Sequence, residues 1–181
     1  VYIRSPQQRQ MWLTDNSWDE HVTENPNGGN LLQSASFAAV KARHGWKPVH
    51  LVYEGTTERP GADGGAVEQT VASYNLVLEK RVPLLGRLWY MIKGPDVADV
   101  RDIPAILDAN REFVRREGLD VFAIKIEPDI LDSPERAAFL HRAGLVKQFN
   151  IQPNDSTAVL DTDKDEEAVL LSLIHISSPR D

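Results

Sequence analysis

The sequence predicts an α/β domain in which helices flank a mixed, mostly antiparallel sheet. Short runs that alternate apolar and polar residues are typical of strands, and they are interleaved with segments that carry apolar residues at helical spacing. With 181 residues, of which 41% are hydrophobic and 26% charged, the chain is long enough for one substantial core. It contains no cysteine, so a disulfide framework and a thiolate metal site are both excluded.

Two helices, a turn and a strand come first. A helix over residues 18–23 is expected after a polar cap, and residues 26–29 are a cluster of turn formers. A second helix begins after the cap Ser34 and ends at Gly45. The strand that follows, over residues 48–53, has two faces, with Val49, Leu51 and Tyr53 on one and His50 and Val52 on the other.

The middle of the chain is predicted to continue the sheet. Residues 55–65 contain several glycines and are expected to form a flexible hairpin loop. Strands are expected over residues 67–80 and 84–92, joined through residues 81–83. Consecutive strands with short connections favour antiparallel pairing.

The second half adds helices. Residues 99–116 carry apolar side chains at helical spacing, and Gly118 closes the helix. Residues 119–126 are rich in β-branched and aromatic residues and are predicted to be a buried strand. A serine cap followed by proline begins a helix over residues 133–142. Two more short strands are predicted, over residues 145–151 and 157–160.

Both ends of the chain look foreign to the domain. The first methionine is Met11, so residues 1–10 are interpreted as a non-native or disordered lead without a fold. Residues 11–171 are the expected domain, whose last helix begins at Lys164 with acidic residues in its first turn. Residues 172–181 break the pattern, look like translated cloning or adapter sequence, and are interpreted as an artefactual tail.

Charge and hydropathy exclude several kinds of protein. The net charge of −7 argues against a general binder of nucleic acids or membrane surfaces, although it is compatible with a local basic pocket. No apolar run approaches the roughly 20 residues that a membrane-spanning helix needs. The five histidines have no metal-ligand spacing, and no nucleophile elbow, P-loop or HExxH motif is present. The residues alone therefore indicate an α/β domain without specifying its reaction.

The predicted order of elements is also that of the GNAT acyltransferase fold. GNAT enzymes that use acetyl-CoA hold its pyrophosphate on an Arg/Gln-x-x-Gly-x-Gly/Ala loop at a helix N-terminus. Residues 115–118 supply half of such a motif, but they lie at the end of a helix, where the dipole disfavours phosphate. Acetyl-CoA is therefore a poor cofactor prediction.

Three segments resemble a known enzyme family. Residues 30–46 contain Leu-Gln-Ser, a short helix that carries Lys41, and Gly-Trp before a strand. Residues 90–95 read Tyr-Met-Ile-Lys-Gly-Pro, and residues 125–128 read Lys-Ile-Glu-Pro. With these segments the chain resembles the FemAB family of peptidoglycan-bridge aminoacyltransferases, over residues 18–170. The resemblance implies the first of two GNAT-like domains, so the chain is expected to be a fragment of a longer enzyme.

The resemblance also implies a substrate-binding site. In FemAB enzymes a lysine on the helix after Leu-Gln-Ser contacts the diphosphate of the precursor, and Lys41 occupies this position. Tyr90 and Lys93 match residues of the substrate groove, where they can bind the peptide stem and a carboxylate or phosphate. Without the resemblance, Lys41 is a solvated lysine at a helix end and Tyr90 a core tyrosine. No catalytic residue and no metal ligand is assigned.

Other residues that match the family have simpler explanations. Gln33 matches the pattern, and Trp46 does too but is expected to pack in the core. Lys125 and Glu127 share one face of their strand and are expected to pair with each other. Asp129 follows that strand, where a turn explains it.

The family's reaction is aminolysis of an activated ester. The resemblance implies transfer of an amino acid from aminoacyl-tRNA to an amine on the stem peptide of a lipid-linked or UDP-linked muramyl peptide, without a further cofactor. Contact with tRNA is expected mainly from a second domain, so this fragment alone is expected to be inactive. The expected location is the cytoplasm, or the inner face of the membrane as a peripheral protein.

Two other functions remain open. One is a GNAT N-acetyltransferase that acts on a small amine, against which the missing pyrophosphate loop counts. The other is a non-catalytic module that binds diphosphate-linked wall precursors. Fold alone does not choose among these three functions.

Overall fold

The computed structural model describes residues 4–10, 17–60, 66–149, 151, 167 and 170. The chain divides into two compact units, residues 1–147 and residues 148–181. Almost all described residues belong to the first unit. The strand predicted over residues 157–160, the start of the helix predicted from Lys164, and the tail at residues 172–181 lie outside the described residues.

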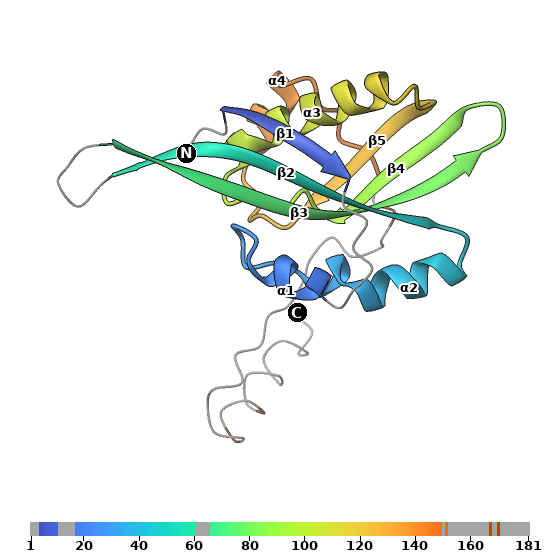
Figure 1. The fold of residues 1–181 in the computed structure, drawn as a ribbon, viewed down its shortest axis with the longest axis horizontal. Helices are drawn as coiled ribbons and strands as arrows, with labels where there is room; N and C mark the ends of the chain where they lie inside the picture. Colours follow the sequence, from blue (N-terminus) through green and yellow to red (C-terminus); the bar gives the residue numbers. More distant parts are fainter. Residues whose placement is uncertain are drawn as a thin grey trace, which may run out of the picture. The chain divides into compact units, whose positions relative to one another are not determined.

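Five strands form one mixed sheet in the order β1-β2-β3-β4-β5 (Figure 1). Neighbouring strands are antiparallel except for the last pair, β4 and β5, which run parallel. The predicted mixed, mostly antiparallel sheet is therefore confirmed. The strands are β1 (Arg4–Gln10), β2 (Lys47–Pro60), β3 (Ala66–Val82), β4 (Gly86–Lys93) and β5 (Val121–Pro128).

Helices cover both faces of the sheet (Figure 1). On one face lie α1 (Ser17–Thr23), the 3-10 turn η1 (Leu31–Gln33) and α2 (Ala35–Arg43). On the other lie α3 (Ile103–Arg116), which follows the 3-10 turn η2 (Val100–Asp102), and α4 (Pro134–Arg142). From α1 through α4, the order of the main helices and strands is the one predicted from the sequence, while β1 was not predicted.

The helix caps explain where these helices begin. The side chain of Ser34 accepts a hydrogen bond from Phe37 N at the start of α2, and Ser133 does the same for Arg136 N at the start of α4. Each serine satisfies a backbone donor that has no partner inside the helix. Both caps were expected from the sequence and are confirmed.

Four expectations about the elements are wrong. Residues 1–10 were expected to have no fold, but residues 4–10 form β1 and pair with β2. Of the loop predicted over residues 55–65, residues 55–60 continue β2 because each pairs across the ladder with β3, and residues 61–65 lie outside the described residues. β5 is only half-buried because, among the described strands, it pairs with β4 alone. Residues 145–149 form no strand.

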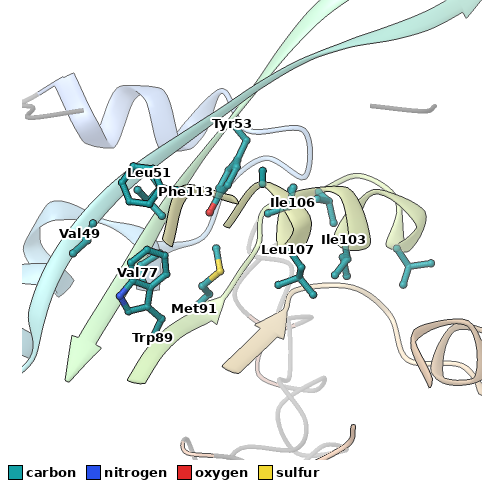
Figure 2. Packing of buried hydrophobic residues seen from close by; sticks show 13 residues of the cluster. Val49, Leu51, Tyr53, Val77, Trp89, Met91, Ile103, Ile106, Leu107 and Phe113 are labelled. Atoms are coloured by element: carbon teal, nitrogen blue, oxygen red, sulfur yellow. The ribbon is translucent and has the colours of Figure 1, made fainter. Parts of the chain in front are cut away.

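The main hydrophobic core lies between the sheet and α3, and we call it the α3-face core (Figure 2). The inner face of α3 presents apolar side chains at helical spacing, and Ile103 and Ile106 are completely buried. They pack against Leu51, Val77 and Met91 from three neighbouring strands. Full burial of one such side chain contributes about 1.5–3 kcal/mol, so this core is the principal source of stability.

A second hydrophobic cluster, the α2-face core, lies on the opposite face of the sheet. Trp18 and Ala38 from the helices pack there against Leu76, Leu78 and Tyr90 from the strands. Because successive strand residues point to opposite faces, Tyr90 belongs to this cluster while its neighbours Trp89 and Met91 belong to the α3-face core.

Candidate functional site

The strands β3 and β4 separate beyond Tyr90, and the side chain of Gln33 fills the gap between them. β4 pairs with β3 only over residues 86–90. Beyond this point Gln33 spans the two strands: its Nε2 donates to Ile92 O, and its Oε1 accepts from Leu76 N at 2.6 Å. Trp18 Nε1 fixes the backbone of Gln33 by donating to its carbonyl oxygen at 2.8 Å. The Gln33 amide thus replaces strand-to-strand hydrogen bonds that the diverging backbones cannot make.

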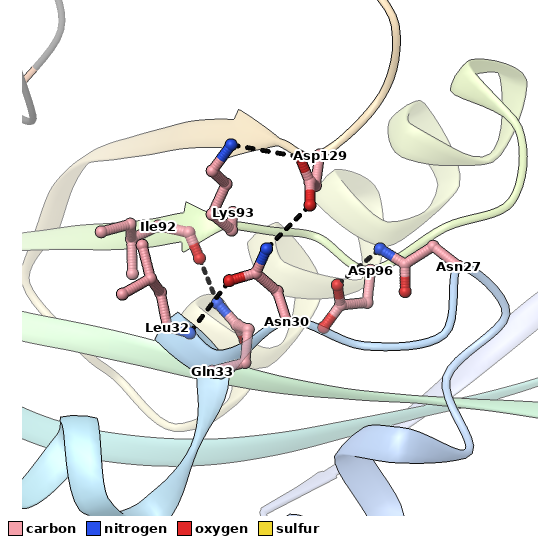
Figure 3. A network of polar contacts seen from close by, with 8 residues as sticks. All are labelled: Asn27, Asn30, Leu32, Gln33, Ile92, Lys93, Asp96 and Asp129. Carbon is pink, nitrogen blue, oxygen red and sulfur yellow. Dashed lines mark hydrogen bonds and ion pairs between the residues drawn. The ribbon is translucent and has the colours of Figure 1, made fainter. Parts of the chain in front are cut away.

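Asn25 plays a similar role further along β3. Its Oδ1 accepts from Tyr74 N at 2.7 Å, and its Nδ2 donates to Tyr74 O at 2.8 Å. The same Nδ2 donates to Asp96 Oδ2 at 2.8 Å. Asn27 Nδ2 donates to Asp96 Oδ1 at 2.7 Å (Figure 3). Buried polar groups are stable in a protein interior when they are paired in this way.

Asp96 is fully buried at the centre of these amides. Its backbone is held from β3, because Asp96 N donates to Asn75 Oδ1 at 2.8 Å and Ser73 Oγ donates to Asp96 O at 2.6 Å. Burial raises the pKa of Asp96 to about 6, and the charge of Asp129 adds to the rise while the two donated amide hydrogen bonds oppose it. We call Asn25, Asn27, Gln33, Asn75 and Asp96 the amide cluster.

The amide cluster borders a group of polar side chains at the carboxyl ends of the parallel strands. Ligands bind preferentially at such strand ends in open α/β sheets. The β4–β5 ladder continues beyond the last residue of β4, where Glu127 N donates to Gly94 O at 3.1 Å. We call this group the strand-end cluster, and it consists of Asn30, Tyr90, Lys93, Lys125, Glu127 and Asp129.

One half of the strand-end cluster is built around Glu127. The hydroxyl of Tyr90 donates to Glu127 Oε2, and Lys125 Nζ lies 3.4 Å from Glu127 Oε1. The ring of Tyr90 is buried in the α2-face core, which fixes the position of its hydroxyl. The side chains of Lys125 and Glu127 keep partial access to solvent. A carboxylate placed in this way can accept a proton or a hydrogen bond from an amine.

The other half is built around Asp129 (Figure 3). Lys93 Nζ lies 3.1 Å from Asp129 Oδ1, and Asn30 Nδ2 donates to Asp129 Oδ2 at 2.8 Å. Asn30 also caps η1, because its Oδ1 accepts from Leu32 N at 2.9 Å. These contacts connect the segment before α2 with the ends of β4 and β5.

The structure brings two of the three predicted substrate-binding residues together. Tyr90 and Lys93 both belong to the strand-end cluster. Lys41 lies in the last turn of α2, with Nζ 5.1 Å from the ring centroid of Phe37, and it makes none of the contacts that define that cluster. At 1.5 Å per residue, it is roughly 10 Å along the helix axis from the cap Ser34. The roles assigned to these residues stay predictions.

Two simpler interpretations from the sequence are confirmed. Lys125 and Glu127 pair on one face of β5. Trp46 packs against the α2-face core, with its ring centroid 6.0 Å from that of Tyr90. For Asp129 the turn interpretation is incomplete, because its carboxylate is bound by Lys93.

Sequence reasoning missed the amide cluster. The run over residues 25–30 contains three asparagines and predicts a turn, which it does form, but their side chains also reach into the sheet. The available signal was the density of amides in front of Gln33. Asp96 was not singled out, although it follows the Gly-Pro of the family-like segment.

Two further observations concern metals and membranes. Among the residues that the structure describes, no group of three or more histidine, aspartate or glutamate side chains is arranged to hold a metal ion. Within the same part of the chain, no helix has both the length and the apolar character needed to cross a bilayer.

Comparison with known proteins gives no family assignment. No protein-family model matches the chain, and no curated protein matches its sequence. Among the solved structures that are similar to it in fold, three are acetyltransferases by their descriptions. An acetyltransferase from Trypanosoma brucei is 14% identical, with a TM-score of 0.41 over 83% of this chain and 99% of its own.

The other two structures are similar to the same degree. A protein described as a probable acetyltransferase is 10% identical, with a TM-score of 0.42 over 86% of this chain and 99% of its own. Glucosamine-6-phosphate N-acetyltransferase from Arabidopsis thaliana is 11% identical, with a TM-score of 0.40 over 87% of this chain and 100% of its own. Similarity at this level says nothing about substrate or reaction.

Proposed function

We propose that this chain is the precursor-binding part of an aminoacyltransferase, which moves an amino acid from aminoacyl-tRNA to an amine on the stem peptide of a peptidoglycan precursor. One observation carries the proposal. The three segments that resemble the FemAB family are far apart in the sequence, yet they meet in the strand-end cluster. Tyr90 of the second segment donates to Glu127 of the third, and Gln33 of the first donates to Ile92 of the second. Asn30 and Lys93 both bind Asp129, the residue directly after the third segment.

The chemistry of this cluster suits an amine acceptor. The amine nitrogen attacks the carbonyl carbon of the aminoacyl ester, the tRNA hydroxyl leaves, and the nitrogen loses a proton. Glu127 can accept that proton or orient the amine, since its carboxylate lies beside the Tyr90 hydroxyl and is partly open to solvent. Lys93, which pairs with Asp129, can instead meet a carboxylate of the peptide when the precursor binds.

Lys41 is proposed to bind the diphosphate of the precursor. It lies on the helix that covers the Tyr90 face of the sheet, and its flexible stem carries a compact positive charge. In this proposal one muramyl peptide contacts Lys41 with its diphosphate and the strand-end cluster with its peptide.

The start of α3 favours this donor over acetyl-CoA. It carries the carboxylates Asp99 and Asp102, and Pro104 has no backbone N–H to offer a phosphate. A hydrogen bond from Arg101 holds the pKa of Asp99 at about 2, so this carboxylate is charged at neutral pH. Arg101 offsets the charge of Asp99, so the missing N–H of Pro104 is the main feature that disfavours a pyrophosphate here.

Binding of a UDP-linked muramyl pentapeptide tests the proposal by calorimetry on the full chain. We expect Lys41→Ala and Glu127→Gln to weaken binding by about tenfold or more each. Arg111→Ala, on the solvent side of α3, is the matched control and should bind as the unmodified chain does. Unchanged binding in Lys41→Ala would remove its assigned role.

A transfer assay with aminoacyl-tRNA, in a protein that joins this chain to a FemAB second domain, tests the reaction itself. Transfer that Glu127→Gln reduces without a matching loss of precursor binding would support the amine-handling role of the carboxylate. Precursor binding without transfer would indicate the non-catalytic module. Saturable acetyl-CoA binding without precursor binding would indicate the N-acetyltransferase instead.

A further inference from the structure

The turn between β3 and β4 places leucine where the backbone favours glycine or asparagine. Leu85 N donates to Val82 O at 3.2 Å, which closes a four-residue turn with Pro83 at its second position. Leu84, at the third position, has a φ of 68°. A turn with proline second and a positive φ third is type II, and its third position is usually glycine or asparagine.

Burial does not explain these leucines either. The Leu84 side chain is completely exposed, with a relative accessibility of 106%, and Leu85 is 60% exposed. A branched side chain in the left-handed region is unfavourable for the backbone, and an exposed leucine gains nothing from the core. Two adjacent leucines at the tip of a hairpin are therefore unexplained by folding alone.

The same end of the sheet is cationic, although the whole chain carries a net charge of −7. Strand pairing places Lys47 and Arg87 at the same end of the sheet as the turn. Lys47 pairs with Glu79, which lies shortly before the turn in β3, and Arg87 pairs with Arg81 across the hairpin. The loop from α3 arrives there too, since Arg87 N donates to Asp120 O at 2.8 Å. The basic residues at this end are Arg43, Lys47, Lys80, Arg81, Arg87, Arg115 and Arg116.

Three carboxylates, Glu79, Glu117 and Asp120, offset only part of this charge. Arg81 illustrates the arrangement. It lies directly before the turn, its side chain is 76% exposed, and it forms an ion pair with Asp120 at 3.6 Å. Such long basic side chains can remain in the head-group layer while neighbouring apolar residues go deeper.

Trp46 extends this pattern. Its ring is half-buried at the same end of the sheet, and Lys80 Nζ lies 5.2 Å from the ring centroid. Tryptophan beside lysine and arginine is typical of protein surfaces that lie at a membrane interface.

We propose that the β3–β4 turn docks on an anionic lipid bilayer. Leu84 and Leu85 insert among the acyl chains, and the surrounding lysines and arginines contact the phosphate head groups. The argument for lipid over a protein partner is charge complementarity around a small apolar tip, which suits partitioning into a bilayer. This proposal does not rest on the proposed function. The net charge of −7 argued against a general binder of membrane surfaces, but net charge averages over the whole surface and does not describe this basic end.

Co-sedimentation of the full chain with vesicles tests the proposal. The probes are vesicles of phosphatidylglycerol mixed with phosphatidylcholine, and vesicles of phosphatidylcholine alone. The chain is expected to bind the anionic vesicles more tightly, with the difference shrinking as salt screens the charges.

The decisive variant is Leu84→Asn with Leu85→Asn, because asparagine suits the turn and the hairpin should stay folded. It should lower the partition coefficient on anionic vesicles by about tenfold or more. Leu131→Asn, at a leucine that is 82% exposed in the loop after β5, is the matched control and should bind unchanged. Arg81→Gln should reduce binding severalfold on anionic vesicles only.

Three results would overturn the proposal. The first is failure of the unmodified chain to bind anionic vesicles. The second is that the double leucine variant binds them as tightly as the unmodified chain, and the third is that Leu131→Asn loses as much binding as the double variant. Sedimentation equilibrium identifies the rival occupant: self-association that disappears in the double variant, without vesicle binding, would assign the turn to a second copy of the chain.

Discussion

The α3-face core and the amide cluster pack against the same sheet, but they are held together in different ways. In the α3-face core, apolar side chains such as Ile106 and Met91 contact several neighbours without a preferred direction (Figure 2). In the amide cluster, each donor and acceptor has a fixed partner. Gln33 accepts from Leu76 N and donates to Ile92 O, and Figure 3 shows the second of these two bonds. The first depends on buried area and the second on matched partners.

This difference determines how each region responds to substitution. A hydrophobic core tolerates changes that keep its volume. A buried polar cluster does not, because removing one partner leaves the other unsatisfied in the interior. The difference can be measured one side chain at a time.

Gln33→Met should have the largest effect. Methionine keeps a similar length but cannot pair with Leu76 N or Ile92 O, and each unpaired buried group costs about 1–3 kcal/mol. We expect the free energy of unfolding to fall by about 4 kcal/mol, measured by urea denaturation. A loss below about 1 kcal/mol would mean that the strands close the gap without the amide.

Asp96→Asn should change the pH dependence of stability. The raised pKa means that folded Asp96 holds its proton more tightly than the unfolded chain does. Protonation of Asp96 therefore stabilises the folded chain. This stabilisation is complete below the ordinary pKa of 3.8 and is lost as the pH rises through about 6. Relative to Asp96→Asn, the unmodified chain should lose about 3 kcal/mol across this window. Urea melts at several pH values measure this, and parallel profiles would contradict it.

Ile106→Val should have a smaller effect, because it removes one methyl group from the α3-face core. We expect a loss of about 1 kcal/mol in thermal or urea unfolding. Met91→Leu, which conserves volume, should cost less than about 1.5 kcal/mol. If either change costs as much as Gln33→Met, the two regions do not differ in the way described.

Arg111→Ala should have the smallest effect. Arg111 Nη1 lies 2.6 Å from Asp108 Oδ1 on the solvent side of α3, and both side chains are mostly exposed. Exposed pairs at this spacing contribute no more than about 0.5 kcal/mol. A loss above about 1 kcal/mol would show that the outer face of α3 is not simply solvated.

The sequence predicts the α3-face core better than the candidate site. The stripe of Ile103, Ile106 and Phe113 indicates the buried face of α3 because burial leaves a helical period in the sequence. Alternation likewise places Val49 and Leu51 on one face of β2. These patterns exist because packing is non-directional and acts on every turn of a helix or every second strand residue.

The candidate site has no such period. The contact between Tyr90 and Glu127 requires the register of β4 against β5, which the crossover through α3 sets. Alternation predicts that Lys125 and Glu127 share a face but does not say which strand lies beside them. The resemblance to FemAB enzymes indicates Tyr90 and Lys93, yet nothing in the sequence indicates that Asp129 holds Lys93.

The side chain of Asn25 has a consequence for solubility. Where β4 turns away, β3 is left with backbone N–H and C=O groups along its edge, and such an edge can recruit a strand from another molecule and start aggregation. Asn25 occupies both groups of Tyr74, and Gln33 occupies Leu76 N, so these positions are closed to strand addition. Two amide side chains thus protect the open edge of the sheet without adding a strand.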